Sequence, residues 1–264
     1  MSPRESLIGE PSEAAKRKVR EMAVWLLELA KVTHTYRQLS EMLDLQITVL
    51  SRYVKKAVIP SYERSVEIVK TLSQVVNLEN TLIDLLKNVT PEGFFDNSKI
   101  IGNPVILKYA ALECVRRFQG YRVTKILTPA VDGIPIASAC AVELDRPLII
   151  AKKTKEVGVE KFTEYSYTTE DGEVVSWYIP FKSITQSDSI LIIDDVVRKA
   201  ETLKAMINLV KQSNAEVAGV YTLITIGDSY KWVVGNIKYE TVLLGVAGAE
   251  LRFLRKQNIR EVKV

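Results

Sequence analysis

Two adjacent carboxylates, together with the loop that follows them, are the part of this chain best suited to bind a ligand. Asp194 and Asp195 follow the apolar run 190–193, and a short polar loop leads to Thr202, where an amphipathic helix is predicted to begin. A strand that enters a helix through a tight loop presents backbone N–H groups and a helix dipole that bind phosphate. The carboxylates can bind the cis hydroxyls of a ribose or a hydrated magnesium ion. The pattern predicts a ribose 5-phosphate site, with a solvated acidic turn as the alternative.

Three upstream segments extend this pattern. Residues 126–135 are predicted to form a strand and a loop, in which Gly133 permits a ligand to approach the backbone closely. Residues 147–153 are predicted to form a strand that ends in two lysines. Residues 163–178 alternate around an Asp-Gly turn, which predicts a hairpin. Together with the acidic pair, these segments resemble the type I phosphoribosyltransferase family over roughly residues 93–264.

The resemblance implies an α/β domain with a central parallel sheet, flanking helices and a hairpin over the site. It also implies that Asp194 and Asp195 hold the ribose hydroxyls of phosphoribosyl pyrophosphate (PRPP) or a related nucleotide. The 5-phosphate would then be bound by the loop residues Arg198, Lys199, Ala200, Glu201 and Thr202. The pyrophosphate, accompanied by Mg²⁺ as cofactor, would be received by Val131, Asp132, Gly133, Ile134, Lys152 and Lys153.

Two loop residues depart from the pattern of the catalytic relatives. Arg198 stands where the 6-oxopurine enzymes carry a general-base aspartate, and a guanidinium cannot accept a proton at neutral pH. Ala200 replaces the loop glycine, which costs on the order of 1 kcal/mol if φ is positive there. The stretch from the acidic pair through the next helix resembles the purine-operon repressors, PRPP-sensing regulators of the same family. We therefore expect a regulator without catalytic residues. A purine or orotate phosphoribosyltransferase with an accessory helical domain, or a sensor of another phosphorylated ligand, is the alternative.

The N-terminal third carries a second, independent pattern. Between Tyr36 and Lys55 the apolar spacing predicts a helix of about eight residues, a short turn and a second helix that crosses the first. The apolar residues are Leu39, Leu43, Leu45, Leu50 and Tyr53. Asp44 occupies the turn position, and aspartate tolerates the left-handed backbone that such a turn requires. The pair resembles the helix-turn-helix of the Cro/repressor type, within five helices across roughly residues 12–88.

The second helix of this pair would present its exposed side chains to the major groove of operator DNA. These are Gln46, Ile47, Thr48, Ser51, Arg52 and Lys55. Glutamine can pair with adenine, arginine with guanine, and lysine with phosphate. A five-helix interaction domain that does not bind DNA is the alternative. A regulator that reads a pseudo-palindromic operator is normally a dimer, so we expect a homodimer.

These patterns divide the chain into three parts. They are a helix-turn-helix domain over 1–88, a linker over 89–104 and a phosphoribosyltransferase-like effector domain over 105–264. In the last part the predicted helices cover 105–118, 134–143 and 202–213. The predicted strands cover 123–128, 147–152, 189–194, 216–225 and 239–245. We therefore expect an all-α domain followed by an α/β domain whose parallel sheet binds ligands at the carboxyl ends of its strands.

Composition narrows the classes of function. The 264 residues carry a net charge of +4, and 47% of them are hydrophobic, so the chain is mildly basic and able to form packed cores. His34 is the single histidine, and Cys114 and Cys140 lack metal-ligand spacing, which excludes zinc sites and serine–histidine–aspartate catalysis. No apolar run reaches the ~18 residues of a membrane span, and the N-terminus lacks the apolar core of a signal peptide. We expect a soluble, cytoplasmic protein with no membrane partner.

Overall fold

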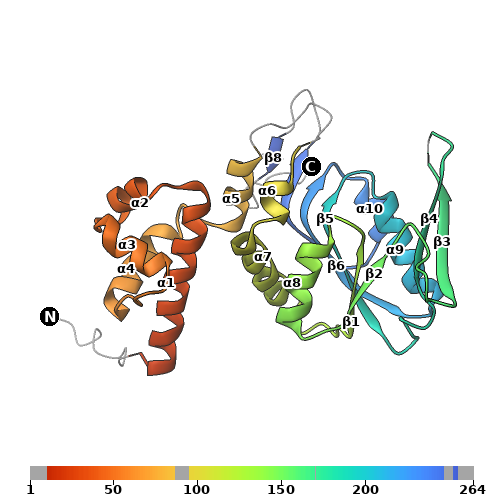
Figure 1. The fold of residues 1–264 in the computed structure, drawn as a ribbon, viewed down its shortest axis with the longest axis horizontal. Coiled ribbons are helices and arrows are strands. Elements are labelled where there is room, and N and C mark those ends of the chain that lie inside the picture. Colours follow the sequence, from red (N-terminus) through yellow and green to blue (C-terminus); the bar gives the residue numbers. More distant parts are fainter. Residues whose placement is uncertain (1–10, 87–94, 170, 247–251, 255–264) are drawn as a thin grey trace, which may run out of the picture. The chain divides into compact units, whose positions relative to one another are not determined.

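The chain divides into two compact units, residues 1–85 and 86–264 (Figure 1). The computed structural model describes residues 11–86, 95–169, 171–246 and 252–254. Of the linker expected over 89–104, residues 89–94 lie outside the described part. No helix within the described residues has the length and hydropathy that crossing a membrane requires.

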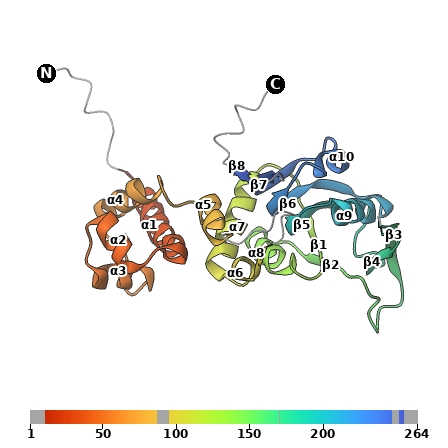
Figure 2. The same cartoon turned by 90° about the horizontal axis from the view of Figure 1, so that it is seen from above.

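Five helices make up the described part of the first unit (Figure 2). They are α1 Glu13–Thr33, α2 Tyr36–Leu43, α3 Ile47–Val54, α4 Tyr62–Leu72 and α5 Leu78–Leu85. The hydroxyls of Ser12, Thr35 and Ser61 accept hydrogen bonds from first-turn N–H groups, which sets the starts of α1, α2 and α4. α1 packs along α4 and also contacts α3 and α5. The expected all-helical N-terminal domain is confirmed.

A three-residue turn joins α2 to α3. Asp44 has a φ of 48°, which is the left-handed backbone predicted for this position. Across the turn, the hydroxyl of Ser40 donates a hydrogen bond to the carbonyl oxygen of Leu45 at 2.5 Å. Leu39 and Leu50 are fully buried. Of the apolar residues predicted to hold the two helices together, Leu39, Leu43 and Leu50 are buried, whereas Leu45 and Tyr53 are half-buried.

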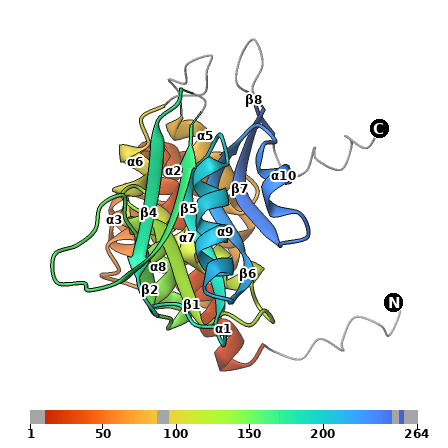
Figure 3. The ribbon, with the colours of Figure 1, turned by 90° about the vertical axis from the view of Figure 1, so that its right-hand side faces the viewer.

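The second unit is built on a six-stranded sheet within its described residues, with strand order β2-β1-β5-β6-β7-β8. The strands are β1 Lys125–Pro129, β2 Leu148–Ala151, β5 Ser189–Val197, β6 Glu216–Ile226, β7 Tyr239–Val246 and β8 Arg252–Leu254. Neighbouring strands pair in parallel, except that β8 runs antiparallel to β7. One face is covered by α7 Pro104–Arg117 and α8 Ile134–Leu144. The other is covered by α9 Glu201–Gln212 and the hairpin of β3 Phe162–Thr168 and β4 Val174–Pro180 (Figure 3).

β5 is buried on both faces of the sheet. Ile190 and Ile192 lie in the core formed with Leu203 of α9 and Trp177 of the hairpin. The intervening Leu191 is also fully buried and points to the opposite face, because side chains alternate along a strand. A strand of this kind is typical of the centre of a parallel sheet. Its carboxyl end is where such folds bind ligands.

The fold class expected from the sequence is confirmed, and the structure adds elements that were not predicted. Residues of the expected linker form α6 Ser98–Ile101, and α10 Tyr230–Val234 follows β6. The predicted end of β5 at residue 194 was too early. Val196 and Val197 continue to pair with β6, because β-branched residues extend a strand readily.

Asp188 links the start of β5 to the start of β1 through hydrogen bonds. Its carboxylate accepts hydrogen bonds from Lys125 Nζ at 2.8 Å, Thr124 Oγ1 at 2.9 Å and the backbone N–H of Thr185 at 2.8 Å. Burial alone would raise the pKa of Asp188. The hydrogen bonds from Lys125 and Thr185 outweigh burial and hold that pKa well below its usual range.

Asp188→Asn should lower the free energy of unfolding by about 2 kcal/mol at neutral pH, because hydrogen bonds to a charged group contribute about 1.5–3 kcal/mol. The folded pKa lies below the unfolded one, so this contribution is present above about pH 4 and is lost as the pH falls further. Urea unfolding measured from about pH 7 to about pH 3 should show the difference between wild type and variant shrinking. Asp171→Asn, on the exposed hairpin turn, is the control. A difference that is constant with pH would contradict the prediction.

Candidate functional site

The acidic pair lies near the carboxyl end of β5, at the centre of the sheet. Asp194 is in register with Thr222 of β6, and the two aspartates are only 8% and 7% exposed. The backbone N–H of Asp195 donates to Oδ1 of Asp194 at 3.0 Å. Nδ2 of Asn97 donates to Oδ2 of Asp195 at 2.6 Å. Because both carboxylates are buried, the solvated acidic turn considered as an alternative is wrong.

The surroundings of Asp194 disfavour its ionised form. Burial raises the pKa of the Asp194 carboxyl well above its ordinary value of 3.8, and the neighbouring charges of Asp195 and Asp132 raise it further. A cation, or hydroxyl groups that donate hydrogen bonds, would stabilise the carboxylate and oppose this shift. Strongly shifted pKa values cluster at functional sites. The acidic pair therefore suits a ligand that brings positive charge or hydroxyl donors.

A cavity of about 430 Å³ follows the acidic pair. The described residues that line it are Asp194 and 196–203. Ala200 has a φ of 47°, so alanine adopts the left-handed backbone that glycine favours. α9 starts at Glu201, and its N-cap residue Ala200 makes no side-chain hydrogen bond to the first turn. A helix N-terminus of this kind binds anions through backbone N–H groups and the helix dipole. The predicted loop residues 198–202 are thus brought together around one cavity.

The position of the loop is fixed from the side of α10. The hydroxyl of Ser229 donates a hydrogen bond to the carbonyl oxygen of Arg198 at 2.7 Å. Burial lowers the pKa of the half-buried Arg198 guanidinium, and the charge of Asp195 opposes that effect. The guanidinium keeps a positive charge because its ordinary pKa is far above neutrality. Arg198 therefore contributes positive charge next to the cavity.

The loop between β1 and α8 closely approaches the acidic pair. A Cβ atom on Gly133 would lie 2.8 Å from Oδ1 of Asp194 and 2.6 Å from Oγ1 of Thr128. The close approach of these two oxygen atoms is what requires glycine at position 133. The backbone does not require it, because a φ of −71° is allowed for any residue. Val131 and Asp132, in the same loop, are exposed. The structure thus places Gly133 beside the acidic pair, and the charge of Asp132 acts on Asp194.

Gly133→Ala should destabilise the protein by about 1–3 kcal/mol, the usual cost of adding an atom to a packed site. The new methyl group would meet two buried oxygen atoms, those of Thr128 and Asp194. Urea unfolding of the variant measures this loss. Asp132→Ala is the matched control, because it changes the same loop without adding an atom near Asp194. If Gly133→Ala were as stable as the wild type, the loop could not be packed against Asp194.

The two lysines at the end of β2 have other partners. The backbone of Lys152 bridges to Tyr178 of β4, and its side chain forms an ion pair with Glu156. Nζ of Lys153 lies 5.4 Å from the centre of the Trp177 ring. Neither lysine is among the described residues that line the cavity after β5. Their binding of pyrophosphate stays a prediction, and it requires both side chains to exchange partners.

Two residues that the sequence placed in the linker contact the site. Asn97 donates to Asp195 as described above, and the Phe95 ring centre lies 5.0 Å from Cζ of Arg198. No signal in the sequence marked Asn97, because one asparagine before a four-residue helix has no distinguishing pattern.

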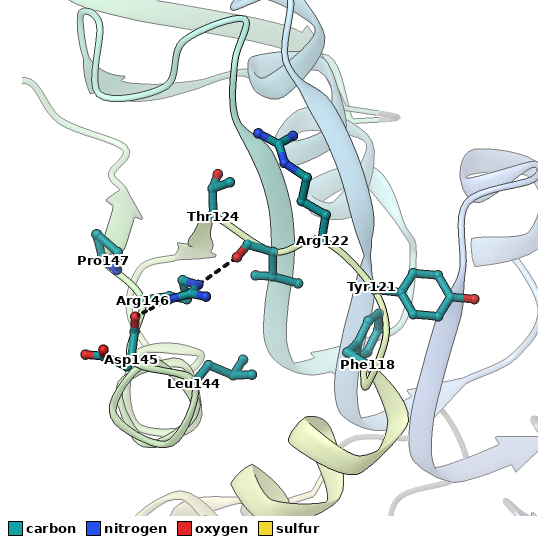
Figure 4. Close-up of a pocket in the computed structure, with 9 residues that line it drawn as sticks. Phe118, Tyr121, Arg122, Thr124, Leu144, Asp145, Arg146 and Pro147 are labelled. Carbon is teal, nitrogen blue, oxygen red and sulfur yellow. Dashed lines mark hydrogen bonds between the residues drawn. The ribbon is translucent and has the colours of Figure 1, made fainter.

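A second hollow of about 500 Å³ lies near the amino ends of β1 and β2 (Figure 4). Its two arginines bind main-chain carbonyl oxygens: Arg146 donates to Val123 at 2.7 Å, and Arg122 donates to Ser187 at 2.6 Å. Sheets of this type bind ligands at the carboxyl ends of their strands. We therefore place the candidate site at the end of β5 and not in this hollow.

In the first unit, α3 exposes the side chains predicted to contact DNA. Gln46, Ile47, Thr48, Arg52 and Lys55 are exposed, and Ser51 is half-buried. Residues spaced three or four apart lie on the same side of a helix, so 48, 51, 52 and 55 form one face. Leu50 is fully buried and packs α3 into its unit. The helix thus combines a buried anchor with a polar, basic face.

Comparison with known proteins identifies the second unit. Residues 105–239, about half of the chain, match the family model described as phosphoribosyl transferase domain. The chain belongs to the phosphoribosyltransferase family. The resemblance predicted from the acidic pair and the upstream segments is confirmed. An adenine phosphoribosyltransferase structure from Thermoanaerobacter pseudethanolicus superposes with a TM-score of 0.57 at 18% identity, over 64% of this chain and 99% of that one. At that identity the match supports the fold alone.

Curated relatives of this phosphoribosyltransferase domain include an enzyme and a repressor. Xanthine phosphoribosyltransferase of Heliobacterium modesticaldum is 32% identical over 124 residues, 46% of this chain and 65% of the relative. The purine biosynthesis transcriptional repressor PurR of Bacillus subtilis is 28% identical over 159 residues, 60% of this chain and 53% of the relative. The chain spans less than two thirds of the length of either.

Proposed function

We propose that this protein is a DNA-binding transcription regulator that senses PRPP or a purine-related nucleotide and controls genes of nucleotide metabolism. The carrying observation is a combination within one chain: an exposed polar face on α3, and a phosphoribosyltransferase domain with Arg198 in its ligand loop. By the family resemblance, Arg198 stands where the 6-oxopurine enzymes carry their general base. An arginine there provides charge for binding a phosphate but cannot take a proton from a base. The similarity to the repressor of B. subtilis supports the same proposal.

In this proposal the ligand is bound by the acidic pair and the two adjoining loops. Asp194 and Asp195 accept hydrogen bonds from the ribose hydroxyls, and the start of α9 receives the 5-phosphate. Within the described residues no group of three metal-ligating side chains occurs. Two carboxylates are nevertheless sufficient for Mg²⁺, which keeps several waters and binds one or two carboxylates together with ligand phosphates. The ion would neutralise charge on the pyrophosphate.

In this proposal the operator is read by α3 in the major groove. Gln46 and Arg52 have side chains that can pair with adenine and guanine, and Lys55 can bind a phosphate. We propose that the regulator acts as a homodimer, because two copies of α3 would match the two halves of a pseudo-palindromic operator. The ligand would then alter operator affinity by a coupling of about 1–3 kcal/mol.

The direct test is a fluorescence-anisotropy titration of labelled DNA from upstream of the protein's own gene. The titration is repeated with Mg²⁺ alone, with Mg²⁺ and PRPP, and with Mg²⁺ and ribose 5-phosphate. We expect operator binding that exceeds binding to scrambled DNA and that changes when PRPP is added. Equal binding to both DNAs at low salt would contradict DNA recognition, and an unchanged titration with PRPP would contradict sensing.

A catalytic phosphoribosyltransferase is the second candidate, favoured by the similarity to xanthine phosphoribosyltransferase. Incubation with PRPP, Mg²⁺ and each of several nucleobases separates the two candidates. The proposed regulator should release no more pyrophosphate with a base than without one. Nucleotide formation at the typical enzyme rate of about 1 s⁻¹ or more would establish an enzyme instead.

A further inference from the structure

A segment just before α6 contacts both the acidic pair and the first residue of the candidate ligand loop. Asn97 donates its side-chain amide to Asp195 at 2.6 Å, and Phe95 places its ring 5.0 Å from the guanidinium carbon of Arg198. Asp195 lies near the end of β5, and Arg198 is the first residue of the loop. Residues 95–97 precede the range 105–239 that matches the family model. We call residues 95–97 the latch.

The latch is anchored on its C-terminal side. On its C-terminal side, the backbone N–H of Ser98 donates to the Asp96 carboxylate at 2.9 Å, and Ile100 of α6 is 1% exposed. In the sequence, its N-terminal side continues through residues 87–94 to the first unit. The buried Ile100 holds α6 in place within the second unit. The chain on the N-terminal side leads to the helices that carry the proposed DNA contacts.

A phosphoribosyl ligand would compete with both latch contacts. A ribose hydroxyl that donates to Asp195 uses the carboxylate that Asn97 now occupies, and a 5-phosphate that binds Arg198 draws the guanidinium away from the Phe95 ring. The ribose hydroxyl and the Asn97 amide are both neutral donors to a carboxylate, so the advantage of the ligand lies at Arg198. There, a phosphate–guanidinium hydrogen bond is charged on both sides and is stronger than a cation–π contact. The ligand therefore favours release of the latch.

From this competition we infer that the latch transmits occupancy of the ligand site to the helical unit; the inference rests on the proposed function. The latched protein and the ligand-bound protein are two states with different positions of Phe95 and Asn97. A ligand shifts their populations in proportion to its differential affinity. By linkage, removing the latch must change the affinity for the ligand and the response of operator binding together.

The test compares the wild type with the double variant Phe95→Ala/Asn97→Ala. Lys99→Ala is the matched control, because Lys99 is exposed on α6 beside the latch. Calorimetric titration with Mg²⁺ and PRPP should show at least about fivefold tighter binding to the double variant, the lower end of typical couplings. In anisotropy titrations with operator DNA, PRPP should change the affinity of the wild type and of Lys99→Ala. It should leave that of the double variant unchanged.

Hydrogen exchange of the wild type gives a measurement that needs no variant. Adding Mg²⁺ and PRPP should speed exchange in peptides covering residues 95–101 and leave peptides from α4 at their original rate. A double variant whose operator affinity responds to PRPP as the wild type does would overturn the latch alone. Unchanged exchange over 95–101 while calorimetry detects PRPP binding would also overturn it. A wild type that binds neither PRPP nor operator DNA would overturn the proposed function and the latch together.

Discussion

Asp194→Asn is expected to weaken the binding of PRPP with Mg²⁺ by about 10- to 100-fold, which corresponds to the 1.5–3 kcal/mol of hydrogen bonds to a charged group. The asparagine keeps the shape of the side chain but cannot supply negative charge to a cation or accept from both hydroxyls. Operator binding without ligand should match the wild type, because the proposed DNA contacts lie on α3. Calorimetry and anisotropy measure the two activities separately. If the folded variant lost both PRPP binding and operator binding, the assignment of these two activities to separate units would be contradicted.

The same variant should remove a pH dependence. Burial and the charge of Asp195 raise the pKa of Asp194 well above its ordinary value of 3.8. The stability that follows from this shift is present below the ordinary value and is lost as the pH rises through the raised pKa. Stability measured by thermal unfolding without ligand should therefore fall less with rising pH in Asp194→Asn than in the wild type.

Ligand affinity should show the opposite trend. A cation or hydroxyl donors prefer the ionised carboxylate, so wild-type affinity for PRPP should increase with pH as Asp194 loses its proton. The variant should lack this increase. Asp145→Asn is the control, because this exposed residue lies at the other end of the sheet, and asparagine tolerates its left-handed backbone. An equal pH slope in wild type and Asp194→Asn would assign the dependence to another group.

Arg52→Ala is expected to lower operator affinity by about 10- to 100-fold, because a bidentate contact from arginine to guanine contributes about 1–3 kcal/mol of discrimination. Arg52 is exposed on α3, one turn beyond Thr48, and the buried Leu50 keeps the helix in place. Anisotropy titrations with operator and scrambled DNA measure the effect. The loss should be greater on the operator than on scrambled DNA, while calorimetry should show unchanged PRPP binding.

The control for Arg52→Ala is Arg64→Ala, which removes the same charge from α4 of the same unit. Arg64 is partly exposed and pairs with Glu67. A loss of affinity as large as that of Arg52→Ala would show that net charge, and not contact by α3, determines binding. Lys55→Ala should weaken binding to both DNAs alike and reduce the salt dependence by about one counterion, as expected for a phosphate contact.

Much of the fold follows from local patterns. The apolar spacing between Tyr36 and Lys55 predicted the helix pair, and Asp44 adopts the left-handed turn expected of it. The apolar run before Asp194 predicted a strand, and this strand is buried on both faces, as consecutive large apolar residues require. The hydroxyl of Ser61 caps the start of α4 by accepting from the backbone N–H of Arg64, three positions along the chain. These features depend on residues close together in the sequence.

The rest depends on contacts between distant residues. Asn97 reaches Asp195 across 98 positions of the chain, and no periodicity reports such a partner. The need for glycine at position 133 was predicted, but its cause, the nearby side chains of Thr128 and Asp194, emerged only from the packing. Lys153 faces Trp177 because the hairpin folds back over β2. Such contacts are determined by tertiary packing.

Ala200 affects the free energy with which the loop binds a phosphate. Its methyl group is buried under α9, and its backbone is held left-handed without the freedom of a glycine. Fewer backbone rotations then have to be frozen when an anion arrives, so less of the interaction free energy is spent on ordering. A preordered phosphate loop favours tight binding of the ligand, which suits a receptor. An enzyme, in contrast, has to release its product in every catalytic cycle.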